Sequence, residues 1–134
     1  MRTLGALAAG LLIGIVTIEA VCAMITLLLD PAAPQPLISR LPLDAVSALA
    51  VAAAWFGGGL LAGCMASAVT GRRLPGWLCG TLLGLSMLLV VNLNDPGSVL
   101  ALIAPAWPLS GALVGSGLAR RCEDCNGADN RHTV

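Results

Sequence analysis

Residues 4–29 read LGALAAGLLIGIVTIEAVCAMITLLL, a stretch in which Glu19 is the only charged side chain. A helix needs about 20 apolar residues to cross the hydrocarbon core of a bilayer, so this stretch is long enough to span it. It also exceeds the apolar core of a secretory signal peptide, which runs for about 7 to 15 residues. We therefore expect a retained membrane-spanning helix at the start of the chain.

Three more apolar runs follow, and they cover residues 43–69, 77–93 and 97–119. Of the 134 residues, 57% are hydrophobic and only 10% are charged, whereas a soluble domain carries roughly 25% charged residues. So few charges cannot cover a surface that faces water, which excludes an ordinary soluble enzyme. The formal net charge is zero and no basic patch stands out, so the chain is not expected to bind nucleic acid.

The sequence therefore predicts an all-α fold, a polytopic membrane protein built as a four-transmembrane-helix bundle. Residues 1–119 form this domain, with spans at about 4–29, 43–69, 77–93 and 97–119, and residues 120–134 form a flexible cytoplasmic tail. Proline and glycine separate the spans, because proline lacks an amide donor and restricts the residue before it. Pro105 and Pro108 are expected to kink the fourth span near its middle.

The arginines predict the orientation. All seven basic residues are arginine. If both termini lie in the cytoplasm, Arg40 is the only one on the opposite, extracytoplasmic side of the membrane. Basic residues favour the cytoplasmic side, so the N-terminus and the C-terminus are both expected there. The absence of lysine, together with abundant alanine and glycine, suggests a bacterial inner membrane.

Each predicted span contains two glycines four residues apart. Small residues let helix backbones approach closely within lipid, so these pairs predict packing faces between the helices. The pairs are Gly10/Gly14, Gly59/Gly63, Gly80/Gly84 and Gly111/Gly115.

The second and fourth spans share a longer pattern. Ala54-Trp55 precedes Gly59 and Gly63 at the spacing at which Ala106-Trp107 precedes Gly111 and Gly115. The first and third spans share a shorter Gly-x-Leu-(Ile/Leu)-Gly pattern. The chain is therefore interpreted as a duplicated helical hairpin, with halves related by an axis along the membrane normal.

Glu19 is the one ionisable acid or base well inside a span, and such residues are functional candidates by default. Three interpretations stay open: a neutral carboxyl hydrogen-bonded to Asn92, Thr26 or a carbonyl near Pro105; a proton or cation site; and an anchor for a partner. Trp55, Asn92 and Trp107 complete the candidate site. The two tryptophans lie on glycine stripes near mid-span.

The cysteines give only a weak indication of a metal site. Cys122 and Cys125 form one C-x-x-C pair after the last span, and no second pair accompanies it. Free thiols are expected on a reducing cytoplasmic side, with no metal and no cofactor. A site that adds His132, or Cys64 and Cys79, to this pair is the alternative. The spans hold no nucleophile–base set, paired carboxylates or phosphate loop, so no enzymatic activity is expected.

The whole chain resembles a set of small four-helix bacterial inner-membrane proteins that have no assigned activity. The residues that carry the resemblance are Ile18-Glu19, Leu41-Pro42-Leu43, Ala54-Trp55 with Gly58 and Gly63, Asn92-Leu93, and Arg120-Arg121. Those proteins often carry Gly-His shortly after the glutamate, where this chain has Cys22-Ala23. The resemblance implies the fold and no function.

Around Glu19 the chain is also similar, locally, to small multidrug-resistance transporters, four-helix proteins with one essential glutamate in the first span. Ile18-Glu19-Ala20-Val21 matches that setting, whereas the lack of tyrosine, the Pro-rich first loop and the charged tail do not. Two functions are therefore expected. One is a non-enzymatic accessory or structural subunit that packs through glycine faces against a membrane-protein partner or a second copy in the lipid bilayer. The alternative is a proton- or cation-coupled transporter or channel for small solutes that works through Glu19.

Overall fold

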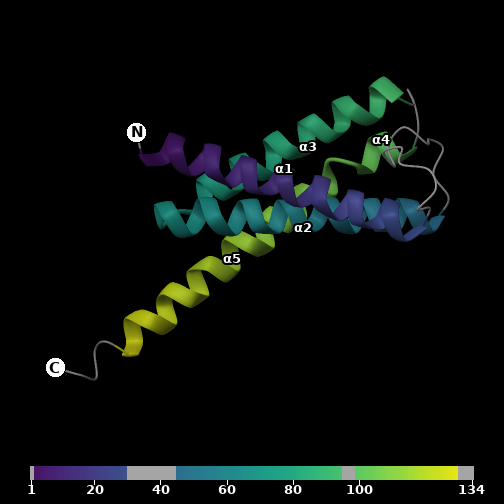
Figure 1. Ribbon diagram of the computed structural model, residues 1–134. Coiled ribbons are helices and arrows are strands. Elements are labelled where there is room, and N and C mark those ends of the chain that lie inside the picture. The colour runs from purple at the N-terminus through teal and green to yellow at the C-terminus, as the bar shows by residue number, and fades with distance from the viewer. Residues whose placement is uncertain (1, 30–44, 95–98, 130–134) are drawn as a thin grey trace.

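The computed structural model describes residues 2–29, 45–94 and 99–129, which are helical apart from short turns (Figure 1). The helices are α1 (Arg2–Leu29), α2 (Ala45–Thr70), α3 (Arg73–Asn94), α4 (Val99–Ile103) and α5 (Ala106–Asp129). By length and composition, α1, α2 and α3 could each cross a membrane. The predicted all-α fold is confirmed, with three of the predicted spans present as single long helices.

The connection between α2 and α3 is a tight turn at Gly71. Gly71 adopts φ +64°, a left-handed conformation that L side chains rarely occupy. Its amide donates to the Ser67 carbonyl at 2.8 Å and so closes the last turn of α2. The next helix begins at Arg73, earlier than the predicted residue 77, because the first turn of a helix tolerates Pro75.

The fourth predicted span, 97–119, is not one continuous helix. It is divided into α4 and α5 by a turn at Ala104 and Pro105. Pro105 supplies no amide to the ladder and disfavours helical geometry at Ala104, and the Leu109 amide restarts the ladder on the Pro105 carbonyl at 3.4 Å. The interruption is thus complete, where the sequence predicted only a kink.

The last helix also ends later than predicted. It continues past Ala119 to Asp129, through part of the sequence expected to be a flexible tail. Residues 119–124 hold alanine, two arginines and glutamate, which favour helix, and no proline interrupts them. Residues 130–134 of the predicted tail lie outside the described residues.

The second helix is the centre of the bundle, because α1, α3 and α5 all pack against it. Trp55 of α2 is fully buried, together with Ile18 of α1 and with Leu83 and Val91 of α3. Figure 1 shows α5 crossing α2, with its C-terminal half diverging from the other helices. The core is therefore built on α2, and α5 is attached to it at the crossing.

Glycines bring α2 and α5 into direct backbone contact. A Cβ atom added at Gly59 would overlap the backbone of Pro108, and one added at Gly63 would overlap the backbone of Ala112. From the other side, Gly111 meets the Phe56 carbonyl. Gly115 meets the Leu60 carbonyl in the same way. No residue larger than glycine fits these four positions without moving the helices apart.

These contacts are reciprocal. The sequence shift that carries Gly59 to Gly111 also carries Phe56 to Pro108. Gly59 lies on Pro108, while its counterpart Gly111 lies on Phe56, as expected for two equivalent helices that meet across a two-fold axis. The second glycine of each helix repeats this relation one helical turn further along, because Gly63 lies on Ala112 and Gly115 lies on Leu60.

The glycines of α1 and α3 lie on less regular contacts. Gly10 and Gly14 of α1 face α2, and they also touch Cys79 and Leu83 of α3. Gly80 of α3 faces α5, whereas Gly84 faces the turn before it, and a Cβ at Gly84 would lie 3.0 Å from the Pro105 carbonyl oxygen. The close approach of α3 to the α4–α5 break therefore depends on Gly84.

Replacing Gly59 tests the α2–α5 contact. Gly59→Ala should lower the free energy of unfolding by about 1–3 kcal/mol, because the added methyl group overlaps the Pro108 backbone. Gly57→Ala is the matched control on the same helix, since a Cβ there meets nothing within 4 Å. Thermal unfolding in detergent should separate the two variants, and equal melting temperatures would contradict the contact.

Candidate functional site

Glu19 is exposed on the outward face of α1. Ile18, next to it, points the other way and is buried against the core. The helical neighbours Ile15, Val16 and Ala23 are exposed on the same side as Glu19. The carboxyl therefore lies on an apolar surface that faces outward, not into the bundle.

The polar residues expected near Glu19 bond elsewhere. The Thr26 hydroxyl donates to the Cys22 carbonyl at 2.8 Å. The Asn92 side-chain amide donates to the Leu88 carbonyl at 3.0 Å, and Asn92 is exposed on α3. Each side chain thus bonds to a carbonyl of its own helix, as polar side chains commonly do in apolar surroundings.

The two tryptophans occupy different environments although their sequence contexts match. Trp55 is fully buried in the core, whereas Trp107 is half-buried and packs against the edge of that core. The difference follows from the packing of the outer helices. Both α1 and α3 cover α2, but among the described residues only α3 of these two packs extensively on α5.

The four candidate residues occupy different environments in the structure. Trp55 is in the interior, while Glu19 and Asn92 are exposed on α1 and α3. Ile18, Trp55 and Leu83 fill the interior beside Glu19 and are almost completely buried. In this part of the described bundle, the space next to the Glu19 helix is packed core.

Cys79 makes a contact that the sequence did not suggest. Its thiol donates to the Leu7 carbonyl at 3.6 Å and so links α3 to α1. The only sequence signal was its spacing, one residue before Gly80 of the α3 glycine pair. Cys79 is therefore a buried packing residue, in keeping with the usual behaviour of unreactive cysteines.

Metal ligands are not gathered in the described part of the chain. No group of three or more His, Cys, Asp or Glu side chains there is arranged to hold an ion. The side chains of Cys122 and Cys125, and all of His132, lie outside the described residues. The alternative metal site at the C-x-x-C pair is thus not addressed by the structure.

Compared with protein-family models, with curated proteins and with solved structures, the chain shows no match.

Trp55 offers a test of the core. Its indole N–H is buried and has no hydrogen-bond partner in the described bundle, an arrangement that costs about 1–3 kcal/mol. Trp55→Phe removes this donor, so it should lower the free energy of unfolding far less than Trp55→Ala, for which about 3–5 kcal/mol is expected. Denaturation in mixed micelles measures both, with Trp107→Phe as the half-buried control. A Phe variant as unstable as the Ala variant would mean that the indole N–H has a partner.

Proposed function

We propose that this chain is a small multi-pass protein of the bacterial inner membrane, a non-enzymatic accessory or structural subunit. In this proposal, the outward face of α1 around Glu19 docks a partner within the membrane. The observation that carries the proposal is the exposed carboxyl of Glu19 on a helix face that is otherwise apolar.

A membrane location is supported by the three long apolar helices. It is also supported by how polar side chains within those helices are satisfied. Thr17 and Thr81, for example, donate to the Ile13 and Trp77 carbonyls at 2.7 and 2.9 Å. Such bonds within one helix remove the need for water, which the hydrocarbon core does not supply.

The first helix is the least enclosed of the three apolar helices. In the most apolar 18-residue stretch of α1, 11% of the residues are buried, against 44% in the corresponding stretches of α2 and α3. Apolar side chains facing lipid need no partner, so exposure alone is no argument for docking. Glu19 does need a partner, because a charged acidic side chain facing lipid costs several kcal/mol of free energy unless it is protonated or paired.

A partner that offers a basic or hydrogen-bonding side chain to Glu19 would remove this cost. No basic residue lies within the predicted spans of this chain, so a basic partner would have to come from another molecule. The predicted docking through glycine faces is revised accordingly. Gly10 and Gly14 already contact α2 and α3, so the glycine side of α1 is occupied within the bundle.

The duplicated hairpin is the finer part of the fold proposal. The reciprocal contacts of Gly59 and Gly111 support a two-fold relation between α2 and α5. The relation is strongest at that central pair and weaker for α1 and α3, since α3 packs on α2 whereas α1 is not extensively packed on α5 in the described residues. We infer that the outer helices have diverged further than the inner ones.

The orientation can be tested separately from the partner. We expect both termini in the cytoplasm, because this orientation places only Arg40 of the seven arginines on the extracytoplasmic side. A C-terminal fusion to green fluorescent protein should then fluoresce, while a C-terminal alkaline phosphatase fusion should be inactive. The reverse result would place the C-terminus outside and reject the orientation.

Crosslinking in the native membrane tests the docking face. A photoreactive residue at Val16, exposed beside Glu19, should form one crosslinked product with a partner protein. Glu19→Leu should abolish this product and Glu19→Gln should reduce it, because the amide keeps some hydrogen bonding but loses the charge. The matched control is a photoreactive residue at Leu85, equally apolar and exposed on α3, which should give no such product.

Three outcomes would contradict this function. A Val16 product that persists in the Glu19→Leu variant would mean that the carboxyl does not anchor the partner. The absence of any crosslinked protein product at Val16 would mean that this face of α1 docks no protein. Proton- or cation-driven solute flux that Glu19→Gln abolishes without loss of expression would replace the subunit by the rival function, a coupled transporter.

A further inference from the structure

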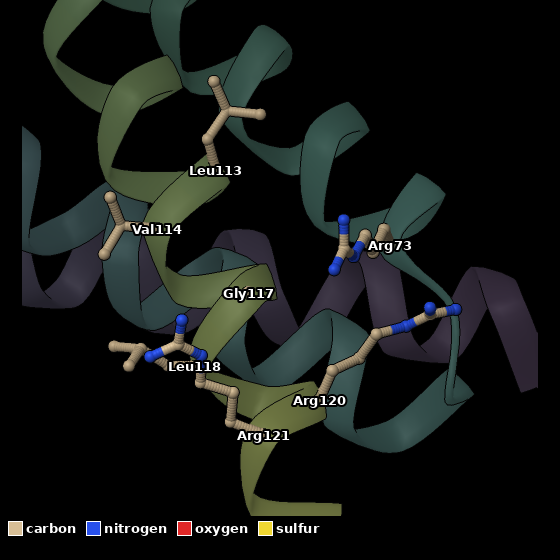
Figure 2. A pocket seen from close by; sticks show the side chains of 7 residues that line it. All are labelled: Arg73, Leu113, Val114, Gly117, Leu118, Arg120 and Arg121. Carbon is tan, nitrogen blue, oxygen red and sulfur yellow. The ribbon is translucent and has the colours of Figure 1, made fainter. Parts of the chain in front are cut away.

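A groove with a volume of about 580 Å³ lies at the start of α3 and along the middle of α5 (Figure 2). Its charged lining consists of Arg73 from α3 and of Arg120 and Arg121 from α5. The rest of its lining comes from α5 and carries no charge: Leu113, Val114, Gly117 and Leu118. All the described residues that line the groove are therefore basic, apolar or glycine.

The two kinds of lining are separated along α5. Leu113 and Val114 lie two turns before Arg120 and Arg121, a separation of about 10 Å at 1.5 Å per residue. Arg73 extends from the neighbouring helix toward α5, on the same side of α5 as Arg120 (Figure 2). A ligand that fits the whole groove must therefore be anionic at one end and apolar over the next 10 Å or so.

Guanidinium groups are suited to phosphate. Each presents a planar set of N–H donors that can form two parallel bonds to phosphate oxygens, and each keeps its charge at any physiological pH. Arg73 and Arg120 present two such groups from two helices on the same side of α5, whereas the Arg121 group lies on the other side, beside Leu118 (Figure 2). A free phosphate ion would use only this end and would leave the wall of Leu113, Val114 and Leu118 uncovered.

We propose that this groove binds an anionic phospholipid. The phosphate lies between Arg73 and Arg120, which are on the same side of α5, and an acyl chain follows the apolar lining contributed by Leu113, Val114 and Leu118. Basic pockets between helices at the cytoplasmic membrane surface are suited to anionic headgroups. This inference rests on the membrane location and orientation given under Proposed function, which bring this end of the bundle to the inner leaflet.

Glu123 and Asp124 follow the arginines in the sequence of α5. They lie further along the helix from the apolar wall than Arg120 does. Along α5 the arginines therefore stand between the apolar residues of the groove and this acidic pair.

Native mass spectrometry of the full chain in a non-ionic detergent tests the proposal. The protein is titrated with phosphatidylglycerol and with phosphatidylcholine of the same acyl chains. Phosphatidylglycerol should bind at least about tenfold more tightly, since a basic residue near the headgroup contributes roughly a fivefold gain in affinity for an anionic lipid. Arg73→Gln and Arg120→Gln should each lower that affinity about fivefold.

The matched control is Arg72→Gln. Arg72 is exposed and adjacent to Arg73 but does not line the groove, so this variant has the same net charge as Arg73→Gln and should bind phosphatidylglycerol like the unaltered chain. Val114→Ser should weaken both lipids equally, because it alters the apolar wall and leaves the charges. Thermal unfolding of each variant checks that the bundle is intact.

Three results would overturn the proposal. The first is equal affinity for the two lipids, and the second is unchanged phosphatidylglycerol binding after Arg73, Arg120 and Arg121 are all replaced by Gln. The third is displacement of the lipid by inorganic phosphate at the lipid's own concentration, which would make the ligand a free anion. Glu19→Leu should leave lipid binding unchanged, so failure of the α1 docking face is distinguishable from failure of the groove. Extraction of the protein from membranes by alkaline carbonate would refute the membrane location itself.

Discussion

The packing of α5 onto the bundle depends on backbone contact between α2 and α5. Gly59, Gly63, Gly111 and Gly115 each lie on a main-chain group of the opposite helix, so the two helices approach as closely as their backbones allow. In lipid there is little hydrophobic drive to press helices together, and association relies on such close packing. The residues between these glycines can be apolar side chains of various shapes, whereas the four glycine positions admit no larger residue.

A bundle whose helices pack through glycine has few side chains that could take part in chemistry. The faces where small residues allow close approach are turned inward, and the outward faces of α1 and α3 carry mainly leucine, isoleucine and valine. The charged groups then stand out. Glu19 is the one charged residue of α1 after Arg2, and arginines gather where α3 begins and α5 leaves the bundle. Both proposals follow from this contrast between an uncharged helical body and a few charges in fixed places.

The apolar runs and the glycine spacing predicted the all-α fold and most of the helix bounds, because burial in lipid requires long uncharged segments. The full interruption at Pro105 was not predicted. A proline within a helix can produce a kink or a break, and here α3 packs against the interrupted segment through Gly84, a tertiary contact that the sequence does not show. The directions of the candidate side chains could not be predicted. Glu19 and Ile18 are neighbours in the sequence, yet their directions depend on which side of α1 meets α2, and periodicity could not decide this in a helix that is apolar on every side.

The central place of α2 has a consequence for how the chain is assembled. Its principal neighbour, α5, is synthesised after α3, because all of α3 lies between them in the sequence. While the ribosome is still producing α3, the glycine surface of α2 has no permanent neighbour and is open to any small-residue helix nearby. The contact between α2 and α5 therefore forms only after α5 is synthesised, and a chain that stops before Ala106 exposes the α2 surface that α5 otherwise covers.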